Sequence, residues 1–321
     1  MGYITDFPNG VSSFGLPATG ASSPSFGLVY FVDGTNGNDG NDGDSPSGAF
    51  KTITAALAAQ IANTGGLGDK IYILPGSYAE SVTGAMSKVE IIGVNVGSEV
   101  AHAVSIRPTA SYAYTGSMTD SAWRNILFMS PATSNTEYAA IMPTYMGYST
   151  IDNCLIIGKT STCVVGIQIG TPADDATTEK MDYSSIKNCV ISTFYGVTSQ
   201  FTYGIQFGAL TNTNIATKQM HNSVIANNRI EAGITGISIG VDSSKALGTV
   251  IRGNVISSQA ASNGVSSYGI AAVDSMVTGM VIGNHIKAES DGIYNFASKG
   301  VFDNYISLSG AAVVAEGPVR T

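Results

Sequence analysis

A short segment centred on Asn recurs six times in the second half of this 321-residue chain, and this repeat restricts the fold more than any other feature. The copies read IDNCLI, IKNCVI, ANNRI, RGNVI, IGNHI and FDNYI, at intervals of 20 to 40 residues. A second element, such as GIQIG from Gly166 or GISIG from Gly236, follows each of the first five copies. Repeats of this length without a helical pattern between them indicate a solenoid in which each copy is one coil.

Alternation inside the copies predicts β-strands. The residue two places after Asn is aliphatic in every copy, whereas the residue one place after it varies from Cys154 to Arg229 and Tyr305. This period of two residues is typical of a strand with one buried face. We therefore expect short strands that stack about 4.8 Å apart in a parallel β-helix. On this alignment the outward-facing apolar residues are Cys154, Ile156, Cys189, Ile191 and Val255.

Asn suits a repeated position for two physical reasons. It tolerates the left-handed backbone of a sharp corner better than other residues with a side chain. Stacked Asn side chains can also hydrogen-bond to one another along the solenoid. The alternative is a β-sandwich in which Asn marks ordinary turns. We predict one structural ladder made of Asn153, Asn188, Asn228, Asn254, Asn284 and Asn304.

Composition excludes several classes of protein. The chain is 44% hydrophobic and therefore not disordered, and only 12% of its residues are charged, with a net charge of -8. It has no basic run, so we expect no nucleic-acid partner. It has no apolar run long enough for a membrane span, and its first residues lack the basic and apolar regions of a signal peptide. The three cysteines, Cys154, Cys163 and Cys189, have neither the spacing of a metal site nor that of a disulfide framework.

Residues 33–44, DGTNGNDGNDGD, raise the question of a metal loop. The stretch lacks the ligand spacing and the final Glu of an EF-hand. The alternatives are a weak cation site at Asp39, Asp42 and Asp44, a flexible linker, or a structured turn. Because an apolar strand precedes the stretch and a helical pattern follows it, we expect the structured turn.

A single amphipathic helix is predicted over residues 45–63. Its apolar stripe consists of Ile53, Leu57 and Ile61, and Ser45 or Ser47 is the expected N-cap. The open end of a β-helix exposes its core and unpaired strand edges. We expect the helix to cover that end.

Two stretches carry resemblances to known proteins. The run YFVDGTNGNDGNDGDSPSGAFKTITAAL, followed by IYILPGSYAE, resembles the start of right-handed parallel β-helix proteins of the pectate-lyase-like superfamily. The run GYITDFPNGVSSFGLPATG resembles the N-terminal arm of tailed-phage virion proteins. The resemblances imply an all-β, single-stranded right-handed parallel β-helix with a capping helix and an extended arm. The expected divisions are an arm over 1–28, an opening strand, turn and helix over 29–66, and the β-helix over 67–321.

The sequence does not present a set of catalytic residues. Enzymes of this fold need carboxylates within reach of one another on outward strand positions. The three outward columns that the repeat defines contain almost no carboxylates, and Gln168 and Gln206 lead one of them. A weak acidic candidate set lies in the segment 171–185: Asp174, Asp175, Glu179 and Asp182. We expect no catalytic residue, no cofactor and no metal.

These observations favour a non-enzymatic virion component of a tailed phage: a capsid decoration, spike or fibre-like appendage. The arm residues Tyr3, Phe7, Phe14 and Phe26 would dock on other virion proteins. The expected partners are other copies of the chain in a homotrimer, those virion proteins, and host surface glycans. The alternatives are a glycan-cleaving tailspike, a secreted polysaccharide lyase or hydrolase, and a passive glycan-binding adhesin. The expected location is the virion surface, with an extracellular location as the alternative.

Overall fold

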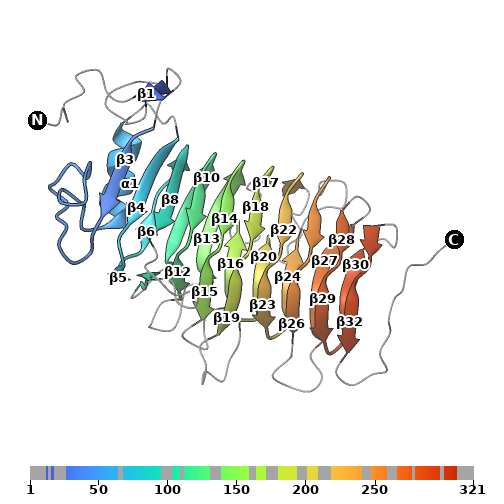
Figure 1. Cartoon of the computed structure of the whole chain (residues 1–321). Helices are drawn as coiled ribbons and strands as arrows, with labels where there is room; N and C mark the ends of the chain where they lie inside the picture. Colours follow the sequence, from blue (N-terminus) through green and yellow to red (C-terminus); the bar gives the residue numbers. More distant parts are fainter. Residues whose placement is uncertain are drawn as a thin grey trace, which may run out of the picture.

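The chain forms an elongated parallel β-helix whose coils follow one another along a single axis (Figure 1). The computed structural model describes residues 27–63, 68–94, 103–108, 112–130, 139–158, 164–170, 180–193, 201–208, 218–240, 247–258, 266–276, 279–296 and 300–308. It also describes the backbone of an antiparallel pair, β1 (Ser12–Ser13) and β2 (Leu16–Pro17). The predicted parallel β-helix is confirmed.

Three parallel sheets make up the described part of the helix. The ten-stranded sheet contains β3 (Val29–Val32), β4 (Asp69–Ile73), β8 (Val89–Gly93), β11 (Ala122–Arg124), β14 (Thr150–Asp152), β18 (Ser185–Lys187), β22 (Val224–Ala226), β25 (Val250–Arg252), β28 (Met280–Ile282) and β31 (Val301–Phe302). The nine-stranded sheet contains β5 (Gly76–Tyr78), β9 (Val104–Ile106), β12 (Leu127–Met129), β15 (Leu155–Gly158), β19 (Val190–Thr193), β23 (Arg229–Ala232), β26 (Val255–Ser258), β29 (His285–Ala288) and β32 (Tyr305–Leu308). The eleven-stranded sheet contains β6 (Val82–Thr83), β7 (Met86–Ser87), β10 (Tyr114–Thr119), β13 (Ala139–Gly147), β16 (Val165–Ile169), β17 (Lys180–Asp182), β20 (Tyr203–Phe207), β21 (Gln219–His221), β24 (Thr235–Ile239), β27 (Tyr268–Met276) and β30 (Asp291–Phe296).

Two columns of left-handed residues turn the chain at either end of the ten-stranded sheet. The first corner, between the eleven- and ten-stranded sheets, consists of Lys88, Asp120, Tyr148, Tyr183, Asn222 and Gly248, all with φ between 46° and 67°. The second corner, between the ten- and nine-stranded sheets, consists of Asn125, Asn153, Asn188, Asn227, Gly253, Gly283 and Asp303, with φ between 51° and 63°. Asn and Gly dominate the second corner because they adopt this conformation at little cost.

The buried Asn ladder occupies the position directly after the second corner. The backbone N–H and the side-chain Nδ2 of Asn228 both donate to Oδ1 of Asn254, at 3.0 Å each. Asn254 donates to Asn284 in the same way, and Asn284 to Asn304, at 2.9 Å. These four asparagines therefore hydrogen-bond to one another in one column.

Asn153 and Asn188 do not belong to that column, and this part of the prediction is wrong. Both are exposed corner residues with a left-handed backbone. In their coils the ladder position is held by Cys154 and Cys189, which are buried, and the N–H of Cys189 donates to Oδ1 of Asn228 at 2.9 Å. The two properties that were ascribed to one Asn column are thus divided between two adjacent columns.

The same shift reverses the predicted inside and outside of two coils. Cys154, Ile156, Cys189 and Ile191 are at most 1% exposed and lie in the core. Only Val255 of the predicted outward apolar residues is exposed. Ile156 pairs in register with Ile191, and Ile191 with Ile230, so both continue the buried Ile column of the later coils.

Glycine in the second repeated element is required by close packing. A Cβ on Gly236 would lie 2.2 Å from Cγ2 of Ile256 and 2.7 Å from the carbonyl oxygen of Gly269. The equivalent residues of the neighbouring coils meet the same obstacle. The Gly column therefore makes room for the Ile column of the nine-stranded sheet.

The helix α1 (Ile53–Ala62) lies at the N-terminal end of the solenoid and buries Ile53 and Leu57 in its core (Figure 1). It starts later than predicted. Its N-cap is Thr52, not Ser45 or Ser47, and Ile61 is 49% exposed.

The stretch 33–44 and a distant carboxylate determine where the helix starts. Asp39 accepts hydrogen bonds from the N–H groups of Lys51 and Thr52, both at 2.8 Å. Glu80 accepts from the N–H groups of Ile53 and Thr54 at 2.8 and 3.0 Å. Glu80 thus satisfies the first two free N–H groups of the helix, and the N-cap Thr52 accepts from the third, that of Ala55, at 3.1 Å. Asp39 fixes the two residues that lead into the helix, and the structured turn expected over 33–44 is what the structure shows.

The ladder makes a prediction about stability. Replacing Asn254 by Ala removes hydrogen bonds to two neighbouring coils and leaves the buried N–H of Asn228 without an acceptor, at a cost of about 2–4 kcal/mol in the free energy of unfolding. Asn304→Ala, at the half-buried end of the ladder, is the control and should cost less. Denaturant unfolding monitored by circular dichroism measures both, and equal losses would contradict this role.

Candidate functional site

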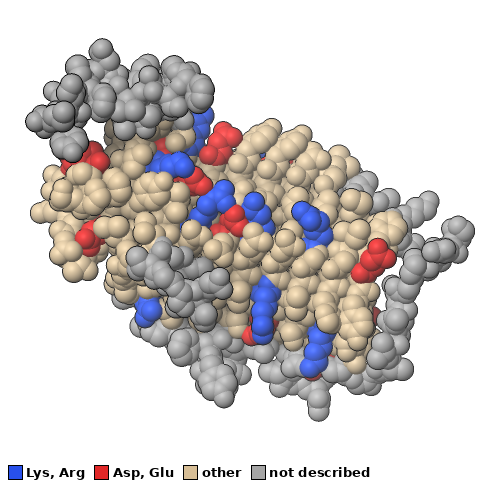
Figure 2. Space-filling model, in the orientation of Figure 1, with Lys and Arg blue, Asp and Glu red and all other residues tan. Residues whose placement is uncertain are grey.

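A strip of alternating charges crosses the outer face of the ten-stranded sheet (Figure 2). Arg124 forms ion pairs with Glu90 on the preceding coil and with Asp152 on the following one. Lys70 lies 3.3 Å from Glu90, and Lys187 lies 3.8 Å from Asp152. Each of these three cations therefore pairs with Glu90, with Asp152 or with both, and the three positive charges exceed the two negative ones by one.

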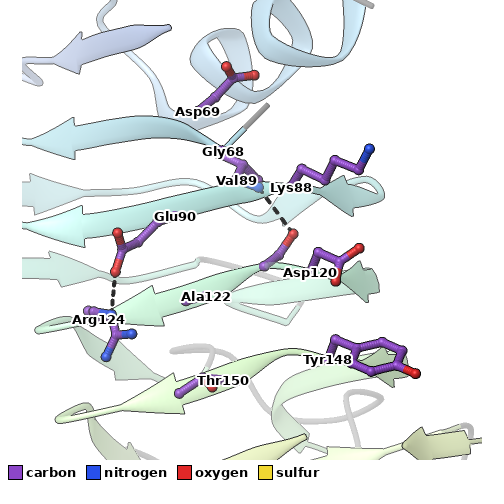
Figure 3. A pocket seen from close by; sticks show the side chains of 11 residues that line it. Gly68, Asp69, Lys88, Val89, Glu90, Asp120, Ala122, Arg124, Tyr148 and Thr150 are labelled. Atoms are coloured by element: carbon purple, nitrogen blue, oxygen red, sulfur yellow. Dashed lines mark hydrogen bonds and ion pairs between the residues drawn. The ribbon is translucent and has the colours of Figure 1, made fainter. Parts of the chain in front are cut away.

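A pocket of about 310 Å³ opens at the edge of this strip, next to the first corner (Figure 3). Lys88, Asp120 and Tyr148 come from three successive coils along one side, while Arg124 and Thr150 lie on the sheet itself. The lining is mainly polar. A pocket with these groups offers both hydrogen-bond donors and acceptors to a polar ligand.

Two stacked tyrosines continue the first corner beyond the pocket. The rings of Tyr148 and Tyr183 are parallel within 1°, with centroids 4.9 Å apart. They are 61% and 54% exposed, and both residues have a left-handed backbone, with φ of 52° and 50°. Bulky side chains rarely occupy this conformation, which costs about 1 kcal/mol or more. We call this pair the tyrosine platform.

A carboxylate and a histidine lie beside the platform. Asp182, at the end of β17, directly precedes Tyr183, and its Oδ1 lies 3.5 Å from Nδ1 of His221 on the next coil. That oxygen is buried and has no hydrogen-bond partner among the described residues. An Asp–His pair of this kind can accept a proton from a bound hydroxyl.

Ionisation differs between the strip and the platform. Burial raises the pKa of Glu90, but ion pairs with Arg124 and Lys70 more than offset it and leave the pKa below its usual value. Glu90 therefore stays ionised and paired. Burial, followed by the charges of Asp182, Tyr148 and Asp120, raises the pKa of Tyr145. Its phenol therefore stays neutral at physiological pH.

Of the acidic candidates predicted from the sequence, only Asp182 lies in the described part of the chain. Asp174, Asp175 and Glu179 lie outside it, as do the arm residues Tyr3, Phe7, Phe14 and Phe26. Gln168 and Gln206, expected on an outward surface, are at most 1% exposed. Among the described residues no group of three His, Cys, Asp or Glu side chains could hold a metal ion. No helix in the described part of the chain is long and apolar enough to cross a membrane.

The charged strip and the tyrosine platform were not predicted, because the columns compared in the sequence follow Asn or Gly and lie in the other two sheets. The sequence nevertheless contains a pattern that marks this sheet. Ser121, Ser149, Ser184, Ser223 and Thr249 each stand four residues before a second-corner residue. In the structure these residues form a second buried column, in which the N–H of Ser149, for example, donates to Oγ of Ser184 at 3.0 Å. Alignment on this constant spacing places Tyr148 and Tyr183 in one column.

No protein-family model and no curated protein sequence matches the chain. Solved structures do resemble it. The GH136 lacto-N-biosidase of Eubacterium ramulus has a TM-score of 0.61 at 14% identity, over 87% of this chain and 56% of that chain. An alginate lyase from Paenibacillus sp. has a TM-score of 0.51 at 13% identity, over 78% and 85% of the two chains. Pectate lyase Pel9A has a TM-score of 0.50 at 13% identity, over 90% and 73%.

The likeness establishes the fold as a right-handed parallel β-helix, as the sequence predicts. At these identities it does not extend to an activity. This chain spans little more than half the length of the lacto-N-biosidase, 56% of it.

Proposed function

We propose that this protein binds glycans through the tyrosine platform and acts by contact rather than by cleavage. The tyrosine platform is the observation that carries the proposal. Asn222 and Gly248 occupy the same corner column at lower conformational cost, so the two rings need a reason other than the fold. The two rings cover each other's inner faces, so a sugar can pack its apolar face only on the outer face of the stack or along its exposed edge, where its hydroxyls find hydrogen bonds in the adjoining polar pocket.

The similar structures support a glycan as the ligand class. They include proteins named as a lacto-N-biosidase, an alginate lyase and a pectate lyase. All three names denote action on glycans. The fold is thus one on which glycan recognition is found, although fold alone does not determine function.

The platform can be tested without disturbing the corner. Tyr148→Asn and Tyr183→Asn install the residue that stands at position 222 of the same column, so the left-handed backbone is retained. We expect the double variant to lose glycan-array binding at least about tenfold, which corresponds to roughly 1.4 kcal/mol. Tyr305→Asn is the control, because Tyr305 is 55% exposed but lies on the nine-stranded sheet. Undiminished binding by the double variant would refute the role of the tyrosine platform in glycan binding.

We propose further that the protein is a structural component of a tailed-phage virion, a capsid decoration, spike or fibre-like appendage, assembled as a homotrimer. The support is the sequence resemblance of residues 1–28 to virion arms. Full-length protein should then occur in purified particles as a threefold feature in electron micrographs, and a chain that lacks residues 1–28 should be missing from them. Recovery of the protein only as a free monomer would count against this proposal.

A second candidate function is glycan cleavage, which the Asp182–His221 pair favours because an Asp–His pair can act as a general base next to a bound sugar. The contact proposal expects no release of oligosaccharides from any glycan that binds. Release that is abolished by Asp182→Ala and by His221→Ala, but not by the distant Asp303→Asn, would establish the enzyme instead. Mass spectrometry of the soluble products provides the measurement.

A further inference from the structure

We propose that the tyrosine platform selects uncharged glycans, namely chains of neutral hexose or N-acetylhexosamine units, and disfavours polyuronates. This inference rests on the proposed function, because it specifies which glycan the platform holds. It follows from the charges that surround the two rings.

Each ring of the platform has a carboxylate beside it. Asp120 stands immediately before Tyr148 in the corner column, lines the pocket and is exposed (Figure 3). It has no ion pair within the part of the chain that the structure describes. Asp182 directly precedes Tyr183 in sequence, and its nearest basic group is the His221 ring at 3.5 Å. A sugar carboxylate above the platform would therefore approach two negative charges.

Most nearby cations are already engaged. Arg124, Lys70 and Lys187 each pair with Glu90 or Asp152 in the strip. Lys88 is the remaining cation of the pocket lining, and in the corner column Asp120 lies between it and Tyr148. In the corner column a uronate at the Tyr148 ring would thus meet Asp120 before it reached Lys88.

The ionisation of Tyr145 agrees with this arrangement. After burial, the causes that raise the pKa of this phenol are Asp182, Tyr148 and Asp120. The charges of the two carboxylates therefore reach this side of the platform, where a bound uronate would be repelled. A neutral sugar ring experiences no such penalty, and its hydroxyls can donate hydrogen bonds to the same carboxylates.

The size of the discrimination follows from Coulomb's law. A like charge about 6 Å away across water weakens binding roughly threefold, so two carboxylates should weaken it roughly tenfold. Added salt should reduce the difference, because both groups are at the surface.

The experiment compares three tetrasaccharides on the full-length protein: N-acetylglucosamine, glucose and galacturonate tetramers. Binding is measured by NMR titration at pH 8, where an ordinary histidine is neutral, and at low and high salt. The variants are Asp120→Asn, Asp182→Asn and their combination. Asn suits the left-handed backbone at position 120. Asp303→Asn is the matched control: it makes the same change in charge at an exposed left-handed residue of the second corner.

We expect at least one neutral tetramer to bind, with the galacturonate tetramer bound at least about tenfold more weakly at low salt. The double variant should strengthen galacturonate binding roughly tenfold and should not strengthen binding of the neutral tetramer, which loses charge-assisted hydrogen bonds to the same two positions, while Asp303→Asn changes neither. Galacturonate binding equal to or tighter than that of the neutral tetramers would overturn the inference and leave the glycan proposal standing. An unchanged galacturonate affinity in the double variant would show that these two carboxylates are not the cause. Absence of binding by all three tetramers would refute the proposed function itself.

Discussion

The register between successive coils is the constraint on which the rest of this structure depends. At both ends of the ten-stranded sheet, a left-handed residue donates its N–H to the next coil: Tyr148 to the carbonyl of Asp182 at 2.9 Å, and Asn153 to that of Lys187 at 3.1 Å. With both ends held, the two corner residues keep one constant spacing in every coil from Asp120–Asn125 to Gly248–Gly253, and the variation in repeat length falls on other parts of the coil. The stacked columns of Asn, Ser, Gly and Ile all require this register.

The register also determines what the surface presents. In a parallel stack, one outward position repeats on every coil, so neighbouring coils place like positions about 4.8 Å apart. At this spacing Tyr148 and Tyr183 stack face to face, and Arg124 reaches a carboxylate on each side. The candidate site is therefore a property of the stack: no single coil contains both rings of the platform or an ion pair of the strip, and the site appears only when coils are superimposed in the correct register.

The fold and the columns could be predicted from the sequence where a residue type has one structural role in the coil, and not where it has two. Gly in the Gly-Ile elements has one role, because each Gly makes room for an Ile of the nine-stranded sheet. These elements predicted the solenoid correctly. Asn has two roles. It serves as a left-handed corner residue at 153 and 188 and as a buried hydrogen-bonding residue at 228, 254, 284 and 304, and in ANNRI both types stand side by side. Alignment on Asn alone therefore shifted two coils by one residue, which in a strand exchanges the inner and outer faces. The predicted start of the helix was wrong for a different reason: Glu80, whose carboxylate accepts from the first N–H of the helix, lies 27 residues away in sequence.

The sequence by itself determined the class of fold, because repeated apolar alternation and closely spaced Gly leave few ways to bury the apolar face other than stacking coils. It also determined that the opening turn precedes a helix and that charge is scarce over most of the surface. Only the tertiary structure decided which residues share a column. That depends on hydrogen bonds between residues 20 to 40 positions apart, which no local pattern records. The tyrosine platform and its carboxylates belong to this second group: the Ser/Thr spacing places the two tyrosines in one column, but only the stacked coils give that column its left-handed backbone and bring the rings into contact.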